Sequence, residues 1–250
     1  MRSLSEPNRT TPLIVGFIPA RWHSTRFEGK PLALINGVPM IQRVFDRACM
    51  SKRLDTIVVL TDDERISQYC SIKGIRCIVV DEECKTGTDR CSKVLELVDG
   101  THFVNIQGDE PLINPDAIDK LIDSHDDNIG VTNAYVEVKD DYKLHDRNVV
   151  KTVLGLNDTA IYYSRYGIPF TQKVEVPFNQ QLGLYMFNRE KLEMFPKLKV
   201  GPLESAESVE MLRFLENGYD VKMVKVDDEG LSVDTPEDLT RVEKFINAFN

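Results

Sequence analysis

The segment IPARWHSTRFEGKPL, residues 18–32, places the basic side chains Arg21, Arg26 and Lys30 in a loop with a glycine and two prolines. The loop directly follows an apolar run at residues 13–18, and a cluster of cations there is costly unless an anion neutralises it. Arginine forks and a lysine point charge are natural partners for a triphosphate. The GxxxxGK[ST] and GxGxxG patterns are missing, which argues against ATPases with a Walker loop and against NAD dehydrogenases. A surface loop with scattered charge is the alternative.

Two further motifs offer carboxylates. In VNIQGDEPLI, Asp109 and Glu110 follow an apolar run at its carboxyl end, where oxygen ligands can hold a divalent ion that bridges phosphates. In LSVDTPEDL, Asp234 precedes a predicted helix and is a candidate second ligand. The alternatives are a turn aspartate at 109 and a helix-capping aspartate at 234. Spacing does not choose between these readings because the two residues are far apart in the chain.

Two short polar motifs begin predicted helices. TGTDR, residues 86–90, carries amides and Arg90 that could hold a base or an acid group, and a plain helix cap by Thr88 is an equal alternative. TDDER, residues 61–65, has the same ambiguity.

The four histidines, His23, His102, His125 and His145, are too scattered in sequence to indicate a metal cluster or a catalytic dyad. No GxSxG motif occurs, so serine hydrolysis has no support.

Composition limits the class of protein. The chain has 250 residues, of which 42% are hydrophobic and 28% charged, which is typical of a folded globular protein. Its net charge of -9 argues against general nucleic-acid binding. No apolar run approaches the roughly 18 residues of a membrane span, and the start, MRSLSEPNRTTP, does not resemble a secretory signal. Five cysteines without a CxxC pair indicate reduced thiols, so we expect a cytoplasmic protein.

Apolar runs alternate with amphipathic stretches along the first half of the chain. The predicted strands cover residues 13–18, 56–60, 76–80 and 102–106, and the predicted helices cover residues 40–49, 64–73 and 88–98. Strands that are almost continuously apolar and separated by single helices indicate parallel βαβ units. The expected fold class is α/β, with a doubly wound, mostly parallel sheet whose ligands bind beyond the carboxyl ends of the strands.

The second half is less regular. Predicted strands cover residues 130–138, 149–154, 161–164, 183–187 and 221–226, and predicted helices cover residues 189–195, 204–217 and 235 to the end. We expect an N-terminal extension at residues 1–12 and a single domain at residues 13–250. Within that domain, residues 138–200 are expected to form a smaller lobe or flap on the substrate side.

The motifs PAR…S.R..GKPL, TDDERI, TGTDR, QGDEPL, YYSRYGIPF, GLYMF, ESVEMLR and VDTPEDL occur together in this order. In this combination the chain resembles the 3-deoxy-manno-octulosonate (Kdo) cytidylyltransferases, or CMP-Kdo synthetases. The likeness runs from about residue 13 to the last helix. It implies a Rossmann-like nucleotidyltransferase that couples CTP to a sugar acid in lipopolysaccharide biosynthesis, releases pyrophosphate and uses Mg²⁺.

The resemblance also implies residue roles by motif position. Arg21, Arg26 and Lys30 would hold the triphosphate of CTP, with Arg21 and Lys30 counted among the catalytic residues, and Asp109 and Asp234 would carry Mg²⁺. Residues implied to border the nucleotide are Thr61, Asp62, Thr86 and Gly87, and Ala20 is a further substrate-binding residue. Residues implied to surround the sugar acid are Arg90, Gln107, Arg165, Tyr185 and Glu210. No covalent intermediate is needed, because the anomeric hydroxyl of the sugar would attack the α-phosphate directly.

Two positions depart from the family pattern. In the segment QLGLY, residues 181–185, Gln181 stands where the family usually has a histidine. In the segment EMLR, residues 210–213, Met211 stands where the family usually has a glutamine. Both belong to the sugar side in the family, so the acceptor is less well defined than the nucleotide. The alternatives are the same reaction on a modified or amino octulosonate, and a nucleotide-sugar binding protein without turnover. The resemblance further implies a homodimer, with CTP and a sugar acid as ligands and neither nucleic acid nor membrane as a partner.

Overall fold

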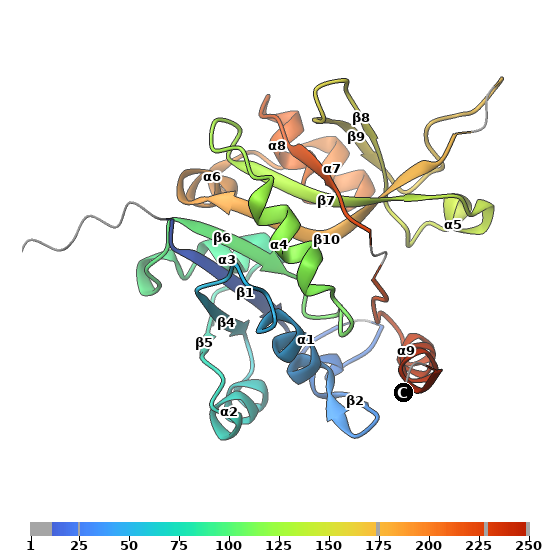
Figure 1. Ribbon diagram of the computed structural model, residues 1–250. Helices are drawn as coiled ribbons and strands as arrows, with labels where there is room; N and C mark the ends of the chain where they lie inside the picture. The colour runs from blue at the N-terminus through green and yellow to red at the C-terminus, as the bar shows by residue number, and fades with distance from the viewer. Residues whose placement is uncertain (1–11, 25, 174–175, 228–229, 249–250) are drawn as a thin grey trace, which may run out of the picture.

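A computed structural model of the chain describes residues 12–24, 26–173, 176–227 and 230–248. These residues form a nine-stranded sheet, flanked by helices, and a short two-stranded hairpin (Figure 1). The strands of the sheet are β1 (Ile14–Ala20), β4 (Thr56–Thr61), β5 (Cys77–Val79), β6 (His102–Ile106), β7 (Val131–Val138), β8 (Lys151–Leu154), β9 (Ala160–Ser164), β10 (Phe178–Asn188) and β11 (Lys222–Lys225). The hairpin consists of β2 (Leu34–Ile35) and β3 (Val38–Pro39).

The helices are mostly short. They are α1 (Met40–Ala48), α2 (Glu64–Lys73), α3 (Gly87–Ser92), α4 (Pro115–Asp123), α5 (Asp141–His145), α6 (Arg189–Met194), α7 (Pro202–Glu207), α8 (Leu212–Glu216) and α9 (Pro236–Ala248). Three 3₁₀ turns, η1 (Lys30–Leu32), η2 (Leu95–Leu97) and η3 (Phe195–Lys197), complete the described elements. Among the described residues, no helix combines the length and the apolar character that a membrane span requires.

The strands that the first half of the chain contributes to the nine-stranded sheet are parallel, as their alternation with helices predicts. In the order β6-β1-β4-β5, each neighbouring pair runs in the same direction. The carboxyl ends of β1, β4 and β6 therefore lie at one edge of the sheet. The segments that follow these ends contain the basic loop, the TDDER motif and Asp109. The sheet thus brings together motifs that are distant in sequence, which is what the fold class predicts.

The expected strand at residues 183–187 is part of the much longer β10, which runs antiparallel to both β6 and β7. The sheet is therefore mixed, although it is mostly parallel. The direction changes because β10 follows the hairpin β8–β9, and no helical crossover returns the chain to the parallel direction. Between Gln181 and Tyr185 the register of β10 against β7 shifts. The side-chain amide of Asn133 on β7 donates to the carbonyls of Leu182 and Leu184 at this irregularity.

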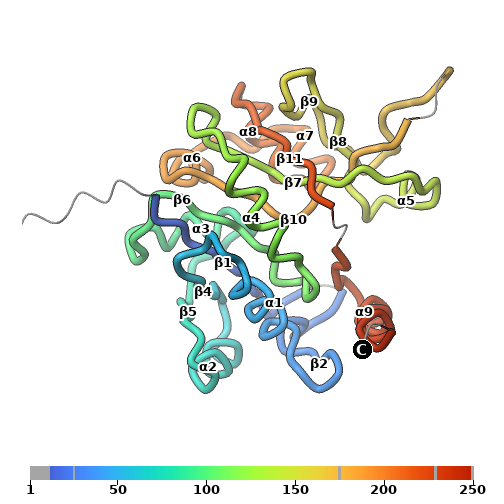
Figure 2. Tube along the Cα trace, in the orientation of Figure 1, coloured from blue at the N-terminus to red at the C-terminus, as the bar shows by residue number. Residues whose placement is uncertain are grey.

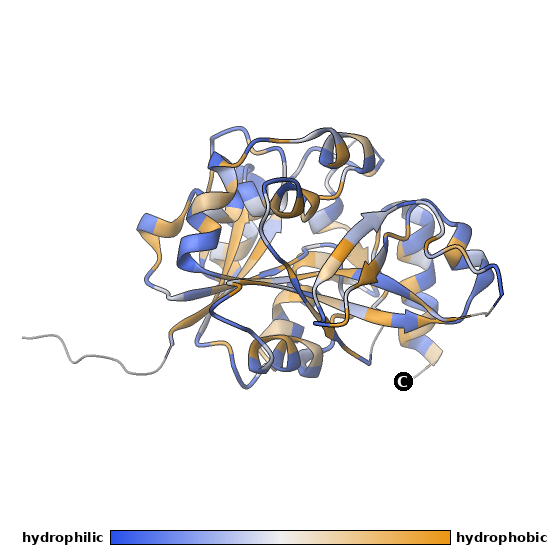
Figure 3. Cartoon of the chain, turned by 90° about the horizontal axis from the view of Figure 1, so that it is seen from above, coloured by the Kyte–Doolittle hydropathy of each residue, from blue (hydrophilic) through white to orange (hydrophobic). Residues whose placement is uncertain are grey.

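Alternate residues of the strands supply two hydrophobic cores on the two faces of the sheet. On β1, Ile18 and Ala20 face one core and Val15 and Phe17 face the other. The first core is covered by α1, α2 and α4, and the second by α3, α6 and α8. The hydropathy colours agree with this layering, because the strands are largely hydrophobic and the outer loops largely hydrophilic (Figure 3).

Some helices differ from the sequence-based expectation. The predicted helix at 88–98 is the short α3 followed by η2, and the one at 204–217 is divided into α7 and α8. The division occurs at Ser208, whose φ of 52° is incompatible with a continuous helix. Helix α4 has no counterpart in the prediction, although Asn114 caps it and proline occupies its first turn.

Helix α9 packs on the hairpin rather than on the main sheet. Val242 of α9 is fully buried in a third core cluster with Ile35 and Met40. Asn36 in the hairpin donates from its backbone amide to Glu243 and from its side chain to Asn247. In Figure 2 the C-terminal helix accordingly lies beside β2. This packing returns the end of the chain to the edge where the basic loop lies.

The expected lobe at residues 138–200 contains β8, β9 and all of β10. In the described residues it continues the main sheet, because Thr152 of β8 pairs with Asn179 of β10. The expected extension at residues 1–12 falls almost entirely outside the described residues, which begin at residue 12.

Two phenylalanines of opposite exposure test this description of the core. Phe214 is fully buried and its ring lies 6.1 Å from that of Phe187 and 5.4 Å from that of Phe195, whereas Phe170 is 88% exposed. We expect Phe214→Ala to lower the free energy of unfolding by about 3–5 kcal/mol, because it removes buried area and leaves a cavity. Phe170→Ala should change it by less than about 0.5 kcal/mol. Urea unfolding of both variants measures the difference, and equal losses would contradict the assignment of Phe214 to the core.

Candidate active site

A cavity of about 260 Å³ opens at the carboxyl edge of the parallel strands. Most of the residues expected on the nucleotide and phosphate side line it. These residues are Ala20, Arg21, Arg26, Lys30, Thr86, Gly87, Asp109 and Asp234. Arg90 and Gln107, which were expected around the sugar acid, line the same cavity. Ser24 and Lys85 also line the cavity. Ser24 belongs to the basic-loop motif but was not among the expected site residues, and Lys85 lies outside every quoted motif. Lys85 precedes the TGTDR motif directly, so its charge beside that motif was an available signal.

Glycines allow the cavity-forming segments to approach one another. A Cβ atom on Gly108 would lie 2.5 Å from the carbonyl oxygen of Pro19, which is closer than atoms can pack. The turn after β6 can therefore sit against the end of β1 only because residue 108 has no side chain. A Cβ atom on Gly87 would lie 3.3 Å from the Pro19 ring, so this segment is also closely packed.

The ammonium group of Lys30 joins the two candidate metal ligands. Its Nζ atom lies 2.7 Å from Oδ2 of Asp109 and 3.6 Å from Oδ1 of Asp234. It also donates to the carbonyl of Val233 at 2.8 Å. The Lys30 side chain is only 13% exposed, so these contacts are shielded from solvent. The structure therefore brings Asp109 and Asp234 to one place, as the resemblance implies.

Asp234 does not cap helix α9, which was the alternative for this residue. Thr235 caps the helix, because its hydroxyl accepts from the backbone amide of Asp238. The Asp238 carboxylate in turn accepts hydrogen bonds from the backbone amides of Asp234 and Thr235. Burial opposes ionisation of Asp238, but these hydrogen bonds outweigh it and lower its pKa. The carboxylate of Asp234 instead contacts Lys30 and Arg26. The Nη2 atom of Arg26 lies 3.0 Å from Oδ1 of Asp234.

Arg90 lines the cavity and has one donor without a partner among the described residues. Its Nη2 atom lies 2.9 Å from Oδ2 of Asp62, which also accepts from the amide of Trp22. Its Nη1 atom is buried and has no hydrogen-bond partner within the described part of the chain. An arginine nitrogen that is buried and unpaired is costly, and a bound anion would satisfy it. Arg21 also has no ion-pair partner among the described residues and is exposed at the cavity.

The TGTDR motif both caps a helix and lines the cavity. The capping residue is Thr86 and not Thr88, because the Thr86 hydroxyl accepts from the amide of Asp89 and the Asp89 carboxylate accepts from the amide of Thr86. The amide of Thr88 donates to Glu210 instead. Glu210 thus contacts the motif that lines the cavity, although it is remote in sequence.

Several residues expected on the sugar side do not line the cavity in this structure. Met211 is fully buried among core side chains and does not line the cavity, so any effect on the acceptor is indirect. Tyr185 is 7% exposed and belongs to the same core. Thr61, which was expected to border the nucleotide, is fully buried and does not line the cavity either. Arg165 donates to the carbonyls of Glu207, Arg147 and Ser208, which gives its guanidinium a structural role in joining two loops. Gln181 is half-buried and donates to the side chain of Asn133.

The fold and these charges define a class of protein. A mostly parallel sheet with cationic and carboxylate side chains at its carboxyl edge is typical of a Rossmann-like nucleotidyltransferase. The sequence profile of the family described as cytidylyltransferase matches residues 15–225. This chain therefore belongs to the cytidylyltransferase family, as the order of its motifs implied.

Individual relatives cover most of the chain. The protein called "3-deoxy-manno-octulosonate cytidylyltransferase, mitochondrial" in Arabidopsis thaliana is 42% identical, covering 95% of this chain and 84% of that protein. The 8-amino-3,8-dideoxy-manno-octulosonate cytidylyltransferase of Shewanella pealeana is 41% identical, covering 89% of this chain and 94% of that protein. A solved structure of CMP:2-keto-3-deoxy-manno-octonic acid synthetase complexed with CTP matches with a TM-score of 0.90 and 31% identity, covering 95% of this chain and 99% of that one.

The environment of Glu210 leads to a pH-dependent prediction. Desolvation raises the pKa of Glu210 above its ordinary value of 4.5, even though Thr86 and Thr88 donate hydrogen bonds to the carboxylate. The folded state then binds more protons than the unfolded state, so this group costs stability as the pH rises above 4.5. We expect Glu210→Gln to remove that cost. The free energy of unfolding of the variant should increase relative to wild type from pH 4.5 upward and level off above the raised pKa.

Urea unfolding between pH 4 and pH 8 measures this difference. Glu96→Gln, at an exposed position, is the control for removing one negative charge from an acidic protein. A difference between Glu210→Gln and wild type that does not change with pH would contradict the burial of an ionisable carboxyl here.

Proposed function

We propose that this cytidylyltransferase transfers CMP from CTP to a Kdo-like sugar acid and releases pyrophosphate. The observation that carries the proposal is the cavity in which Arg21, Arg26, Lys30 and Arg90 gather opposite two carboxylates. The names of the relatives support the substrate class, since they include Kdo and 8-amino-Kdo cytidylyltransferases. The structure complexed with CTP supports the nucleotide.

The residues of this chain would hold two anions next to each other. Arg21, Arg26 and Lys30 would bind the triphosphate, and Arg90 would offer its unpaired Nη1 atom to the nucleotide or to the acid group of the sugar. Positioning is the main task, because the acceptor and CTP repel each other until cations offset their charge. The closely packed turns at Gly87 and Gly108 would keep the donors in fixed positions.

We propose Mg²⁺ as the cofactor, held by Asp109 and Asp234. The donor set fits, because Mg²⁺ binds one or two carboxylates together with substrate phosphates. These carboxylates already share one cation, the ammonium of Lys30, so the place where they meet favours positive charge. When bound, the ion would activate the acceptor hydroxyl and offset the charge that builds up on the α-phosphate.

We further propose a cytoplasmic homodimer. Exposed apolar side chains occur near β9, at Leu156, Ile161 and Tyr166, and a second copy of the chain would cover them. All five cysteines are free thiols, which suits a reducing compartment. The name of the Arabidopsis relative places that protein in the mitochondrion.

Pyrophosphate release tests the reaction. With CTP, Mg²⁺ and Kdo, the protein should release pyrophosphate, and Asp109→Asn and Asp234→Asn should each lower kcat by at least about 100-fold because each removes charge that positions the reacting groups. Asp99→Asn, which changes an exposed carboxylate, should leave the rate unchanged. A coupled pyrophosphate assay gives the rates. CTP binding without pyrophosphate release from any of a panel of sugar acids would support the binding-protein alternative and overturn the proposal.

The acceptor requires a separate experiment, because the relatives named for Kdo and for 8-amino-Kdo are similar to this chain to the same degree. Gln181→His restores the residue typical of the family, and we expect it to shift the ratio of kcat/KM for Kdo over 8-amino-Kdo by about fivefold towards Kdo, the equivalent of one hydrogen bond. Gln180→His, on the opposite face of β10, is the matched control. An unchanged ratio for both variants would show that position 181 does not select the acceptor.

A further inference from the structure

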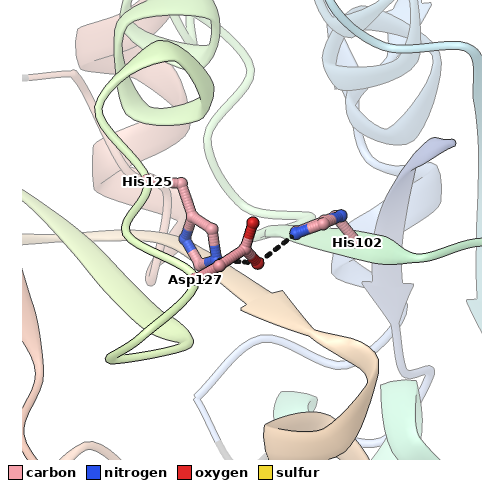
Figure 4. Close-up of side chains that lie close together, drawn as sticks. All are labelled: His102, His125 and Asp127. Atoms are coloured by element: carbon pink, nitrogen blue, oxygen red, sulfur yellow. Dashed lines mark hydrogen bonds and ion pairs between the residues drawn. The ribbon is translucent and has the colours of Figure 1, made fainter. Parts of the chain in front are cut away.

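Two imidazoles and one carboxylate meet at the amino end of β6, at the opposite end of that strand from Asp109. His102 is the first residue of β6, His125 follows helix α4, and Asp127 lies in the turn before β7. The Nε2 atom of His102 lies 2.7 Å from Oδ1 of Asp127, and the Nε2 atom of His125 lies 3.8 Å from the same oxygen. Figure 4 shows both rings turned toward that carboxylate.

The Nε2 atom of His125 has no hydrogen-bond partner among the described residues, although the atom is buried and the side chain is only 4% exposed. A buried polar atom without a partner is rare and calls for an explanation. This unpaired nitrogen faces Asp127.

The other ring nitrogens are both held by threonine hydroxyls. The Nδ1 atom of His102 lies 2.9 Å from Oγ1 of Thr101, and the Nδ1 atom of His125 lies 2.8 Å from Oγ1 of Thr132. In metal sites, a hydrogen bond at the outer ring nitrogen fixes the orientation of a histidine ligand. Here the same arrangement occurs twice and directs both Nε2 atoms to one point.

We propose that His102, His125 and Asp127 form a binding site for a divalent transition-metal ion, with Zn²⁺ as its best-fitting occupant. The three candidate ligand atoms lie within 4.8 Å of one another. Two imidazoles and a carboxylate suit Zn²⁺, whereas Mg²⁺ prefers oxygen ligands throughout. None of the three residues lines the cavity described above.

A small movement would complete the site. A tetrahedral zinc ion with bonds of about 2.0–2.1 Å keeps its ligand atoms about 3.3 Å apart. The two histidines are buried and fixed, but Asp127 is 67% exposed and can rotate toward both. A cavity of about 730 Å³ adjoins His125 and Asp127, so water can reach a fourth coordination position. The ion would tie the turn before β7 to the start of β6 and thereby stabilise the folded chain.

Titration with Zn²⁺ tests the proposal. The full chain is stripped of metal with a chelator and titrated by calorimetry in excess Mg²⁺, which occupies sites built of oxygen ligands. We expect one saturable Zn²⁺ per chain. Asp127→Asn should weaken binding by about 10–100-fold or more, because a ligand is lost. Asp126→Asn, which removes the same charge one residue away, should leave the affinity within about threefold of wild type.

Two further readouts separate this site from other ways of binding zinc. Zn²⁺ should raise the Tm of wild type and of Asp126→Asn but not that of Asp127→Asn, with circular dichroism showing that each variant is folded. Co²⁺ used as a probe should give the visible spectrum of a tetrahedral nitrogen and oxygen site, without thiolate-to-cobalt absorption. The proposal is overturned if no saturable binding occurs, if Asp127→Asn binds as tightly as wild type, or if the cobalt spectrum shows cysteine ligands.

Discussion

The contact of the Lys30 ammonium with Asp109 and Asp234 is the interaction on which the site depends. These carboxylates come from the turn after β6 and from the segment before α9, and two like charges this close repel each other unless a cation lies between them. Solvent screens the repulsion only weakly, because the lysine is largely buried. The hydrogen bond from the amide of Val233 to the carbonyl of Asp109 joins the same two segments. The positive charge of Lys30 therefore stabilises the packing of the segment before α9 against the turn after β6.

The hydrophobic pattern of the sequence predicted the parallel strands and the edge of the sheet at which the site lies. Apolar runs separated by amphipathic stretches sufficed for the parallel strands, because a strand buried on both faces must be apolar along its length. The position of Asp109 and of the basic loop at one edge followed from the shared direction of β1 and β6. Asp234 is different, since only the order of motifs in the family linked it to this edge. Its placement depends on α9 packing against the hairpin, a contact between the two ends of the chain.

The predictions that were wrong or incomplete concern tertiary contacts. Ser208 ends α7 in a left-handed conformation, and nothing in the amphipathic pattern of residues 204–217 indicates a break. Met211 lies just before α8 and is buried in the core, although the resemblance placed it on the sugar side. His102 and His125 are separated by more than one element, so their approach became visible only once β6 and the turn before β7 were side by side. Periodicity shows which face of an element is buried but not which distant side chains share that face.

The pairing of charges in the cavity also determines how it can receive an anion. Lys30 and Arg26 are already neutralised by Asp109 and Asp234, so the cavity attracts a triphosphate less than its count of cations suggests. A nucleotide must compete with the two carboxylates for the same lysine and arginine. A divalent ion bound to the carboxylates would release both cations for phosphate, so under the proposed mechanism each ligand strengthens the binding of the other. Arg21 and Arg90 line the cavity and do not contact either of these carboxylates, so they are the groups that a nucleotide can engage first.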